Sequence, residues 1–242
     1  MLRLLKALPL TLALAALSVF VTSCGSGNST QIRFVHAIRD GGPLDIDVNS
    51  TKIFTDIQWF QYQPSAGYTK ASSGSVTVEG LATGTTTQVF TSTASLGSGQ
   101  YTLIATGSTT GVNGNAVNLL SIPDNNTAPP TGDVEFRVIN AALSTQNASV
   151  DIYILANPVN GGIQPPATIA GLGYTQASSY ITLPFNSNGS GYTMYVTSTG
   201  TTNPIFSQTL SSPTNSIRTY VLTDVQNGSS INPRAIEMTD LN

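Results

Sequence analysis

The sequence offers a single imidazole for chemistry, that of His36. A Ser-His-Asp triad or a histidine-centred metal site would have to include this residue. The chain contains no Gly-x-Ser-x-Gly elbow, no His-Glu-x-x-His pair and no phosphate-binding glycine loop. We therefore predict that the protein is not an enzyme and uses no cofactor. A hydrolase that uses His36 is kept as the weakest alternative.

Three carboxylates follow His36 closely and could hold calcium. Asp45 and Asp47 point to the same face of an extended strand, and Asp40 lies just before them. The set is short of ligands, and the similar segment of the second half keeps only Asp151. We predict no metal site, and we interpret Asp45 and Asp151 as turn-capping or arginine-paired residues.

Two arginines recur at matching places in a chain that has few charges. Arg33 precedes Asp45, and Arg137 precedes Asp151, at nearly the same spacing. Our hypothesis is that Arg33 pairs with Asp45 and that Arg137 pairs with Asp151. Between these arginines and aspartates stand His36 and its counterpart Asn140, an amide that is unable to act as a base but can keep a strand-end hydrogen bond.

The only tryptophan lies in a short aromatic and amide-rich segment. Trp59 stands with Gln58, Gln61 and Tyr62, residue types that stack on sugar rings and hydrogen-bond to hydroxyl groups. Packing in the core explains the neighbouring aromatics, but Trp59 faces Gly171 in the alignment of the two halves described below and is expected to be exposed. This segment predicts a carbohydrate- or peptidoglycan-binding site.

The N-terminus reads as an export signal that ends at the only cysteine. Arg3 and Lys6 precede an apolar run over residues 7–21, which is too short for a spanning helix. Val21-Thr22-Ser23-Cys24 resembles the bacterial lipobox, in which a peptidase cuts before a lipidated cysteine. We expect residues 1–23 to be removed, Cys24 to carry lipid, and residues 24–31 to form a tether.

Export and lipidation together predict a location in the cell envelope. Acyl chains on Cys24 would hold the protein at a membrane, and Gly25 after it favours the outer membrane. No further cysteine is present to form a disulfide, so the fold must be stable through packing and hydrogen bonds alone.

Composition excludes one class of partner. Charged residues make up 9% of the chain, and the formal net charge is −3. Nucleic acid is therefore not expected as a partner, because it binds basic surfaces. Ser, Thr, Asn and Gln must wet most of the surface, which suits an extracytoplasmic protein.

The second half of the chain repeats the first with small insertions. The segments that we align, in order, are 33–37 with 137–141, 44–48 with 150–154, and 102–105 with 220–223, together with Ile57, Phe60, Tyr62 and Tyr68 against Ile169, Leu172, Tyr174 and Tyr180. One insertion falls in the loop at residues 157–166. Because the matching segments recur in the same order, we predict two copies of one module.

Short segments rich in β-branched and aromatic residues alternate with turn residues at the spacing of a sandwich. Phe34 and His36 alternate with Val35 and Ala37, which predicts a strand with one buried face. The predicted fold is all-β, with two tandem immunoglobulin-like antiparallel β-sandwich modules after the signal peptide. The expected bounds are 32–123 for module one, 124–132 for the linker and 133–242 for module two.

The two copies resemble a bacterial exported domain family catalogued as domain of unknown function 4397, often found in lipoproteins. The features that carry the resemblance are Arg33 and Arg137, Asp45 and Asp151, Tyr68 and Tyr180, the junction at 119–126 and the ending at 235–240. The resemblance implies a β-sandwich outside the cytoplasm and transfers no activity. Asn140, in place of the histidine, departs from the pattern.

The function we predict is that of a non-enzymatic envelope lipoprotein, a surface or periplasmic binding or structural module. Its partners would be the membrane, through the lipid, and an envelope protein or glycan. A carbohydrate-binding module centred on Trp59 is the main alternative.

Overall fold

The computed structural model describes residues 29–111, 116–157, 159, 161–186, 191–211, 213–227 and 230–241. The expected signal peptide and Cys24 lie outside the described residues. Across these ranges, no helix has the length and apolar character needed to cross a membrane. The described chain is built of strands with one short 3-10 helix, Leu143–Thr145, which confirms the all-β prediction.

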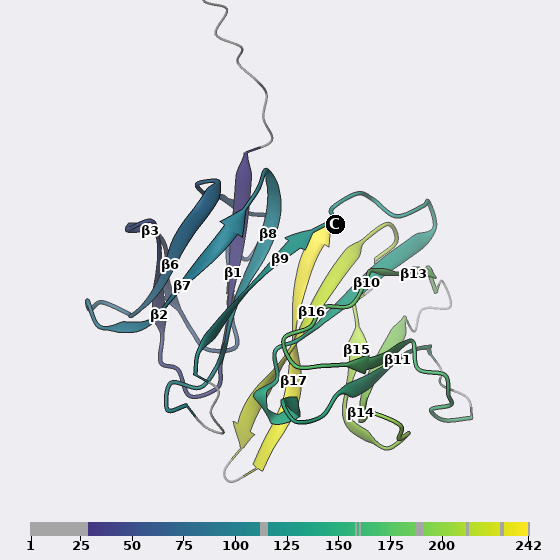
Figure 1. Cartoon of the computed structure of the whole chain (residues 1–242). Coiled ribbons are helices and arrows are strands. Elements are labelled where there is room, and N and C mark those ends of the chain that lie inside the picture. Colours follow the sequence, from purple (N-terminus) through teal and green to yellow (C-terminus); the bar gives the residue numbers. More distant parts are fainter. Residues whose placement is uncertain are drawn as a thin grey trace, which may run out of the picture.

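Module one is a sandwich of two sheets (Figure 1). The inner sheet, named for the side that faces module two, has the order β4-β1-β8-β9, with β5 also pairing with β1. The outer sheet, on the far side of the module, has the order β3-β2-β6-β7. The strand bounds are β1 Thr30–Ile38, β2 Leu44–Val48, β3 Thr51–Ile57, β4 Tyr62–Gln63, β5 Thr69–Lys70, β6 Gly74–Ala82, β7 Gln88–Leu96, β8 Gly99–Gly107 and β9 Asn118–Asp124.

In the described residues, module two has the same topology except that one strand, β13, pairs with β10, where both β4 and β5 pair with β1 in module one. Its inner sheet has the order β13-β10-β16-β17 and its outer sheet the order β12-β11-β14-β15. The strand bounds are β10 Asp133–Asn140, β11 Val150–Ala156, β12 Ile169–Leu172, β13 Ile181–Pro184, β14 Tyr192–Ser198, β15 Pro204–Leu210, β16 Ile217–Asn227 and β17 Ser230–Leu241. Residues 125–132 connect β9 to β10, where the sequence predicts a linker.

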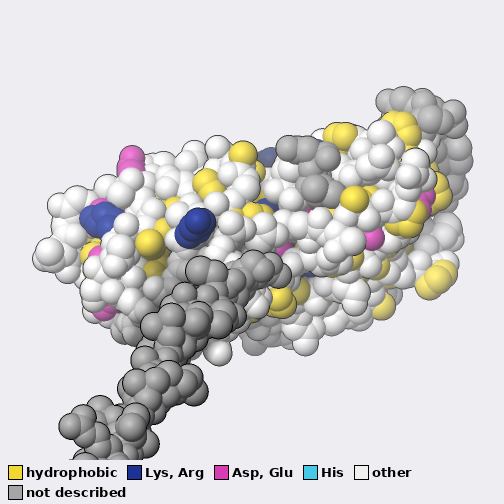
Figure 2. All heavy atoms as spheres, turned by 90° about the horizontal axis from the view of Figure 1, so that it is seen from above, with side chains coloured by type: hydrophobic (Ala, Val, Ile, Leu, Met, Phe, Trp, Pro, Cys, Tyr) yellow, Lys and Arg dark blue, Asp and Glu magenta, His cyan; other side chains and the backbone are white. Residues whose placement is uncertain are grey.

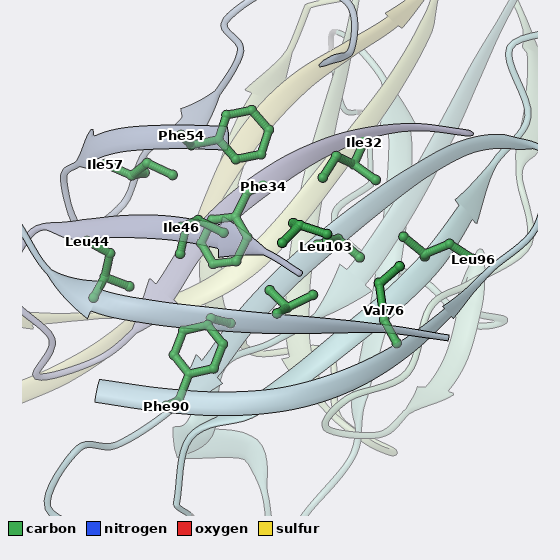
Figure 3. Packing of buried hydrophobic residues seen from close by; sticks show 14 of the residues in the cluster. Ile32, Phe34, Leu44, Ile46, Phe54, Ile57, Val76, Phe90, Leu96 and Leu103 are labelled. Carbon is green, nitrogen blue, oxygen red and sulfur yellow. The ribbon is translucent and has the colours of Figure 1, made fainter. Parts of the chain in front are cut away.

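Alternating apolar residues from both sheets fill the core of each module. In β6, Val76 and Val78 point inward, whereas Ser75 and Thr77 are exposed. Figure 3 shows the core of module one, in which Phe34 of the inner sheet stacks on Phe90 of the outer sheet at 6.4 Å between ring centroids. Apolar burial of this kind is the main driving force for a sandwich that has no disulfide.

One strand pair in each inner sheet is parallel, a feature that the expectation of antiparallel sheets did not include. The first strand of module one, β1, pairs in parallel with β8, and β10 pairs in parallel with β16. All other strand pairs in the described chain are antiparallel. Each module is therefore a sandwich with one mixed sheet.

The two modules pack through their inner sheets, which gives four layers of sheet in all (Figure 1). A third apolar cluster lies between these sheets, separate from the two module cores. It consists of Val35, Ala37, Ile104, Leu120, Ile139, Ala141, Val221, Ile236 and Met238. The prediction of one buried face was therefore wrong for β1, because Val35 faces the other module while Phe34 faces its own core.

The ladder registers correct part of the sequence alignment of the two halves. Arg33 lies opposite Thr102, and Arg137 lies opposite Thr219, so Thr102 corresponds to Thr219 and not to Tyr220. A shift of one residue reverses the face on which every side chain of a strand lies. The correct register places the same side chains on the same faces in both modules.

The alignment around Trp59 was also wrong, by three residues. The amide of Phe60 donates to His36 O, and the amide of Thr175 donates to Asn140 O. Phe60 therefore corresponds to Thr175, and Trp59 corresponds to Tyr174 rather than to Gly171. The alignment of Tyr68 with Tyr180 is correct, since both rings lie over the matching arginines.

Candidate functional site

Four charged side chains meet between the modules at the ends of matching strands. Arg33 lies on β1 and Arg137 on β10, while Asp124 ends β9 and Asp240 lies near the end of β17. All four side chains are buried, with 2% exposure or less. We call these four residues the ionic cluster.

Each arginine makes its shortest contact with the aspartate of the other module. Nη2 of Arg33 hydrogen-bonds to Oδ1 of Asp240 and lies 3.3 Å from Oδ2 of Asp124. Nη2 of Arg137 hydrogen-bonds to Oδ1 of Asp124 and lies 3.8 Å from Oδ2 of Asp240. The two halves of the ionic cluster thus follow the correspondence between the modules, with Arg33 matching Arg137 and Asp124 matching Asp240.

Two threonines complete the hydrogen bonding of the cluster. Thr102 Oγ1 accepts from Arg33 Nε at 2.7 Å and donates to Asp124 at 2.6 Å. Thr219 Oγ1 accepts from Arg137 Nε at 3.0 Å and donates to Asp240 at 2.6 Å. The parallel pairs β1–β8 and β10–β16 place each threonine opposite its arginine. This register brings each hydroxyl within hydrogen-bonding distance of the guanidinium group.

Two tyrosines cover the cluster. The guanidinium carbon of Arg33 lies 5.0 Å from the ring centroid of Tyr68, and that of Arg137 lies 4.6 Å from the centroid of Tyr180. Each hydroxyl donates to an aspartate, Tyr68 to Asp124 at 2.9 Å and Tyr180 to Asp240 at 3.2 Å. Cation–π contact and hydrogen bonding therefore act through the same two side chains.

The electrostatics of the cluster are balanced. Two guanidinium groups face two carboxylates, so the buried charges sum to zero. Burial lowers the pKa of Arg33, but the carboxylates of Asp240 and Asp124 outweigh it and raise that pKa above its ordinary value. Burial raises the pKa of the Tyr68 and Tyr180 hydroxyls, so both stay protonated. The donors and acceptors of the cluster hydrogen-bond to one another, which fixes the positions of the four charged groups.

These contacts contradict the hypothesis that Arg33 pairs with Asp45 and Arg137 with Asp151. Asp45 instead accepts from Lys52 Nζ at 2.7 Å and from the backbone amide of Asp56 at 2.9 Å. The Lys52 bond, followed by that amide, lowers the pKa of Asp45 to about 2.

Asp151 makes the matching backbone contacts in module two. Its carboxylate accepts from the amides of Gly171 and Gly200, both at 2.8 Å. The turn-capping interpretation of Asp45 and Asp151 therefore describes both residues. The sequence analysis did not identify the actual partners, Asp124 and Asp240, although each lies at or next to the end of the final strand of its module.

His36 is fully buried and held by backbone groups. Its Nε2 lies 2.9 Å from Gly42 O, and its Nδ1 accepts from the amide of Ile38 at 3.3 Å. Burial lowers its pKa. Asn140 Oδ1 accepts from the amide of Ala142 at 3.1 Å, so histidine and amide make the same bond two residues along the chain.

The three aspartates near His36 are not gathered into one site. Asp40 accepts from Ser108, Thr109 and Thr110, which closes the turn after β8. In the part of the chain that the structure describes, no group of three or more His, Cys, Asp or Glu residues could hold a metal ion.

The Trp59 segment lies at the rim of the inter-module contact. Trp59 is half-buried, its ring centroid is 5.9 Å from that of Phe60, and its Nε1 is buried without a hydrogen-bond partner. Tyr62 is half-buried and packs against the apolar cluster between the modules, whereas Gln58 and Gln61 are exposed. The equivalent Tyr174 reaches across the module boundary, 3.2 Å from Thr106 Oγ1.

Comparison with known proteins gives a family and no characterised relative. The model of a family described as domain of unknown function (DUF4397) matches residues 30–153, which is half of the chain. The matched part runs from β1 through β10 to β11. No curated protein matches this sequence.

Proposed function

The chain belongs to the DUF4397 family, and from this premise we propose that it is a non-enzymatic lipoprotein of the cell envelope. Its two modules act as one rigid unit with a structural or binding role. The lipid on Cys24 attaches the unit to a membrane, in diderm cells the outer membrane.

The observation that carries the proposal is the use of the recurring charged residues. Arg33, Arg137, Asp124 and Asp240 bind one another, and the recurring Asp45 and Asp151 cap turns. The charged residues that recur in both modules therefore bind other parts of the fold and stabilise it. This arrangement suits a protein that presents loops and sheet faces to a partner.

The surface supports an envelope location. Figure 2 shows one face of the molecule, on which acidic and basic side chains are few and scattered among uncharged polar groups. Such a surface is wetted by hydroxyl and amide groups, as the composition implies. The lipobox-like stretch before Cys24 supplies the attachment.

The anchor is tested by fractionating cells that express the full chain, Cys24→Ala and the control Ser26→Ala. We expect the full chain and Ser26→Ala to incorporate labelled palmitate and to partition with membranes. Cys24→Ala should incorporate none and keep residues 1–23, because the cut requires the lipidated cysteine. Palmitate labelling of Cys24→Ala, or its cleavage to the size of the full chain's product, would contradict the proposal.

A second candidate function is glycan binding at Trp59. It is favoured by the exposed amides of Gln58 and Gln61 beside a half-exposed indole. Because Trp59 is the only tryptophan, its emission reports on this place alone. Emission that shifts on titration with peptidoglycan fragments, with the affinity lost in Gln58→Ala, would support it. An unchanged spectrum across a glycan panel would end it.

A further inference from the structure

Each of the four sheets has two edges, and most of these edges are protected from pairing with another chain. Natural proteins protect edges with proline, charge, bulges or short strands. Proline occurs in β9, β13, β15 and β17, at Pro123, Pro184, Pro204 and Pro233. The edge strands β4, β5 and β12 are two to four residues long.

The remaining two edges belong to the outer sheet of module one, and they differ in whether they carry a protecting feature. Strand β3 carries Lys52 and has two register shifts against β2. Strand β7 has nine residues and contains no proline and no charged residue. Its one register shift lies at its beginning, so the stretch from Thr91 to Leu96 pairs regularly with β6.

The backbone of this stretch has an open side. Within the described residues, the backbone–backbone hydrogen bonds of Thr91–Leu96 all go to β6, and β7 also lies close to β9 of the facing sheet. Thr91, Thr93 and Ser95 are exposed, and Phe90, Ala94 and Leu96 point into the core. A regular strand with one unpaired side is a template for adding another strand.

The equivalent edge in module two shows what is missing from β7. Strand β15 begins at Pro204, which has no backbone N–H to donate, whereas β7 has no proline. Both strands have a register shift near their beginning, so the proline is what distinguishes the two edges. The difference lies in the residues of the strand, since the topology is the same.

We propose that the edge of β7 is a self-association site, where β7 of a second copy of this chain adds in antiparallel orientation. The two four-stranded outer sheets would then form one continuous sheet across a twofold axis. This inference does not depend on the lipid anchor or on glycan binding.

A second copy fits this edge because the strand is self-complementary. In an antiparallel pair about a twofold axis, exposed Thr and Ser side chains face Thr and Ser side chains, a favourable cross-strand combination. No like charges meet, since β7 has none. A charged peptide would find no opposite charge on the strand to select it.

The test is sedimentation equilibrium of the chain without residues 1–23 and with Cys24→Ala, compared with the same chain carrying Thr93→Lys or Thr77→Lys. Thr77 lies directly opposite Thr93 on the exposed face, but on the interior strand β6, so it is a matched control. We expect reversible dimers, an association weakened about tenfold or more by Thr93→Lys, and a change within about twofold for Thr77→Lys.

Amide hydrogen exchange keeps the test decisive if Thr93→Lys lowers the stability of the fold. In the chain without Thr93→Lys, those amides of Thr91–Leu96 that do not bond to β6 should exchange more slowly at high protein concentration than at low concentration, and those of β6 should not change. A monomer at every concentration would overturn the proposal. Equal weakening by Thr77→Lys, which would assign association to the sheet face, would also overturn it.

Discussion

The ionic cluster shows how single residues set the stability of the module contact. Buried ions are costly unless each is paired and hydrogen-bonded. Here each guanidinium has a carboxylate of the other module, a threonine hydroxyl and a tyrosine ring. Removing one member leaves a buried charge without its main partner, whereas removing an arginine and an aspartate together leaves a neutral pair.

Arg33→Ala is therefore expected to lower the free energy of unfolding by about 3–5 kcal/mol. Arg33→Met combined with Asp240→Leu should cost less than Arg33→Ala, because Arg137 and Asp124 remain paired. Arg234→Ala, at an exposed position on β17, is the control and should change stability by about 0.5 kcal/mol or less. Urea unfolding followed by circular dichroism measures all three, and a loss for Arg33→Ala no larger than for the control would refute the argument.

Asp45 gives the fold a dependence on acid. Its pKa in the folded state is about 2, below the ordinary value of 3.8. Its carboxylate therefore contributes stability above a pH of about 4, and this contribution disappears as the pH falls from about 4 to about 2. Asp45→Asn should be less stable at neutral pH and lose less stability over that range. Parallel curves of unfolding free energy against pH for the two proteins would show that Asp45 plays no such part.

At this scale the sequence identified the recurring residue types but not their partners. Arg33, Arg137, Asp45 and Asp151 stand out as repeated charges, yet the distance along the chain pairs each arginine with the wrong aspartate. Arg33 and Asp240 are 207 positions apart and belong to different modules. Their pairing depends on how two whole sheets pack, which local spacing does not encode.

Among the elements, the β6–β7 hairpin depends on one glycine. Gly80 lies opposite Phe90 in the ladder, and a Cβ built at Gly80 would lie 2.1 Å from the Phe90 ring. The ring thus occupies the space that a side chain on β6 would fill. This arrangement lets Phe90 stack on Phe34 in the core.

Gly80→Ala is expected to destabilise module one by about 1–3 kcal/mol, because the ring must move in a close-packed core. Gly42→Ala is the matched control, since nothing lies within 4 Å of its Cβ position. Phe90→Leu in the Gly80→Ala background should recover part of the loss. Thermal unfolding would measure the series, and equal losses for the two glycine variants would count against this packing argument.

The strands themselves were largely predictable, and their registers were not. Alternation in Val76 and Val78 against Ser75 and Thr77 correctly identified a strand with one buried face. In β1 the same reading failed, because a strand in the middle of four layers is buried on both sides. The alignment errors at Trp59 and Thr102 arose where apolar residues match in more than one register, and only the ladder hydrogen bonds decide between them.

At the scale of the whole molecule, the two modules are joined by two buried clusters, so they should behave as one body. The apolar cluster between the inner sheets draws on both modules, and the ionic cluster closes one end of it. Residues 125–132 are also tied to the modules, for example through the Tyr180 hydroxyl and the amide of Asn125. Independent movement of the modules would break both clusters.

Calorimetry should therefore show a single unfolding transition whose van't Hoff and calorimetric enthalpies agree. Val221→Ala, at a fully buried position between the modules, should move the whole transition to lower temperature without dividing it. Two resolved transitions in the unmodified chain would mean that the modules unfold independently.

The separation of Arg33 from Asp240 also sets an order of events in folding. During synthesis from the N-terminus, Arg33 is made 207 positions before Asp240. Until the last strand, β17, has paired with β16, Arg33 lacks its closest counter-ion, and the apolar cluster between the modules lacks Ile236 and Met238. The fold is therefore completed only when the C-terminal strand is in place.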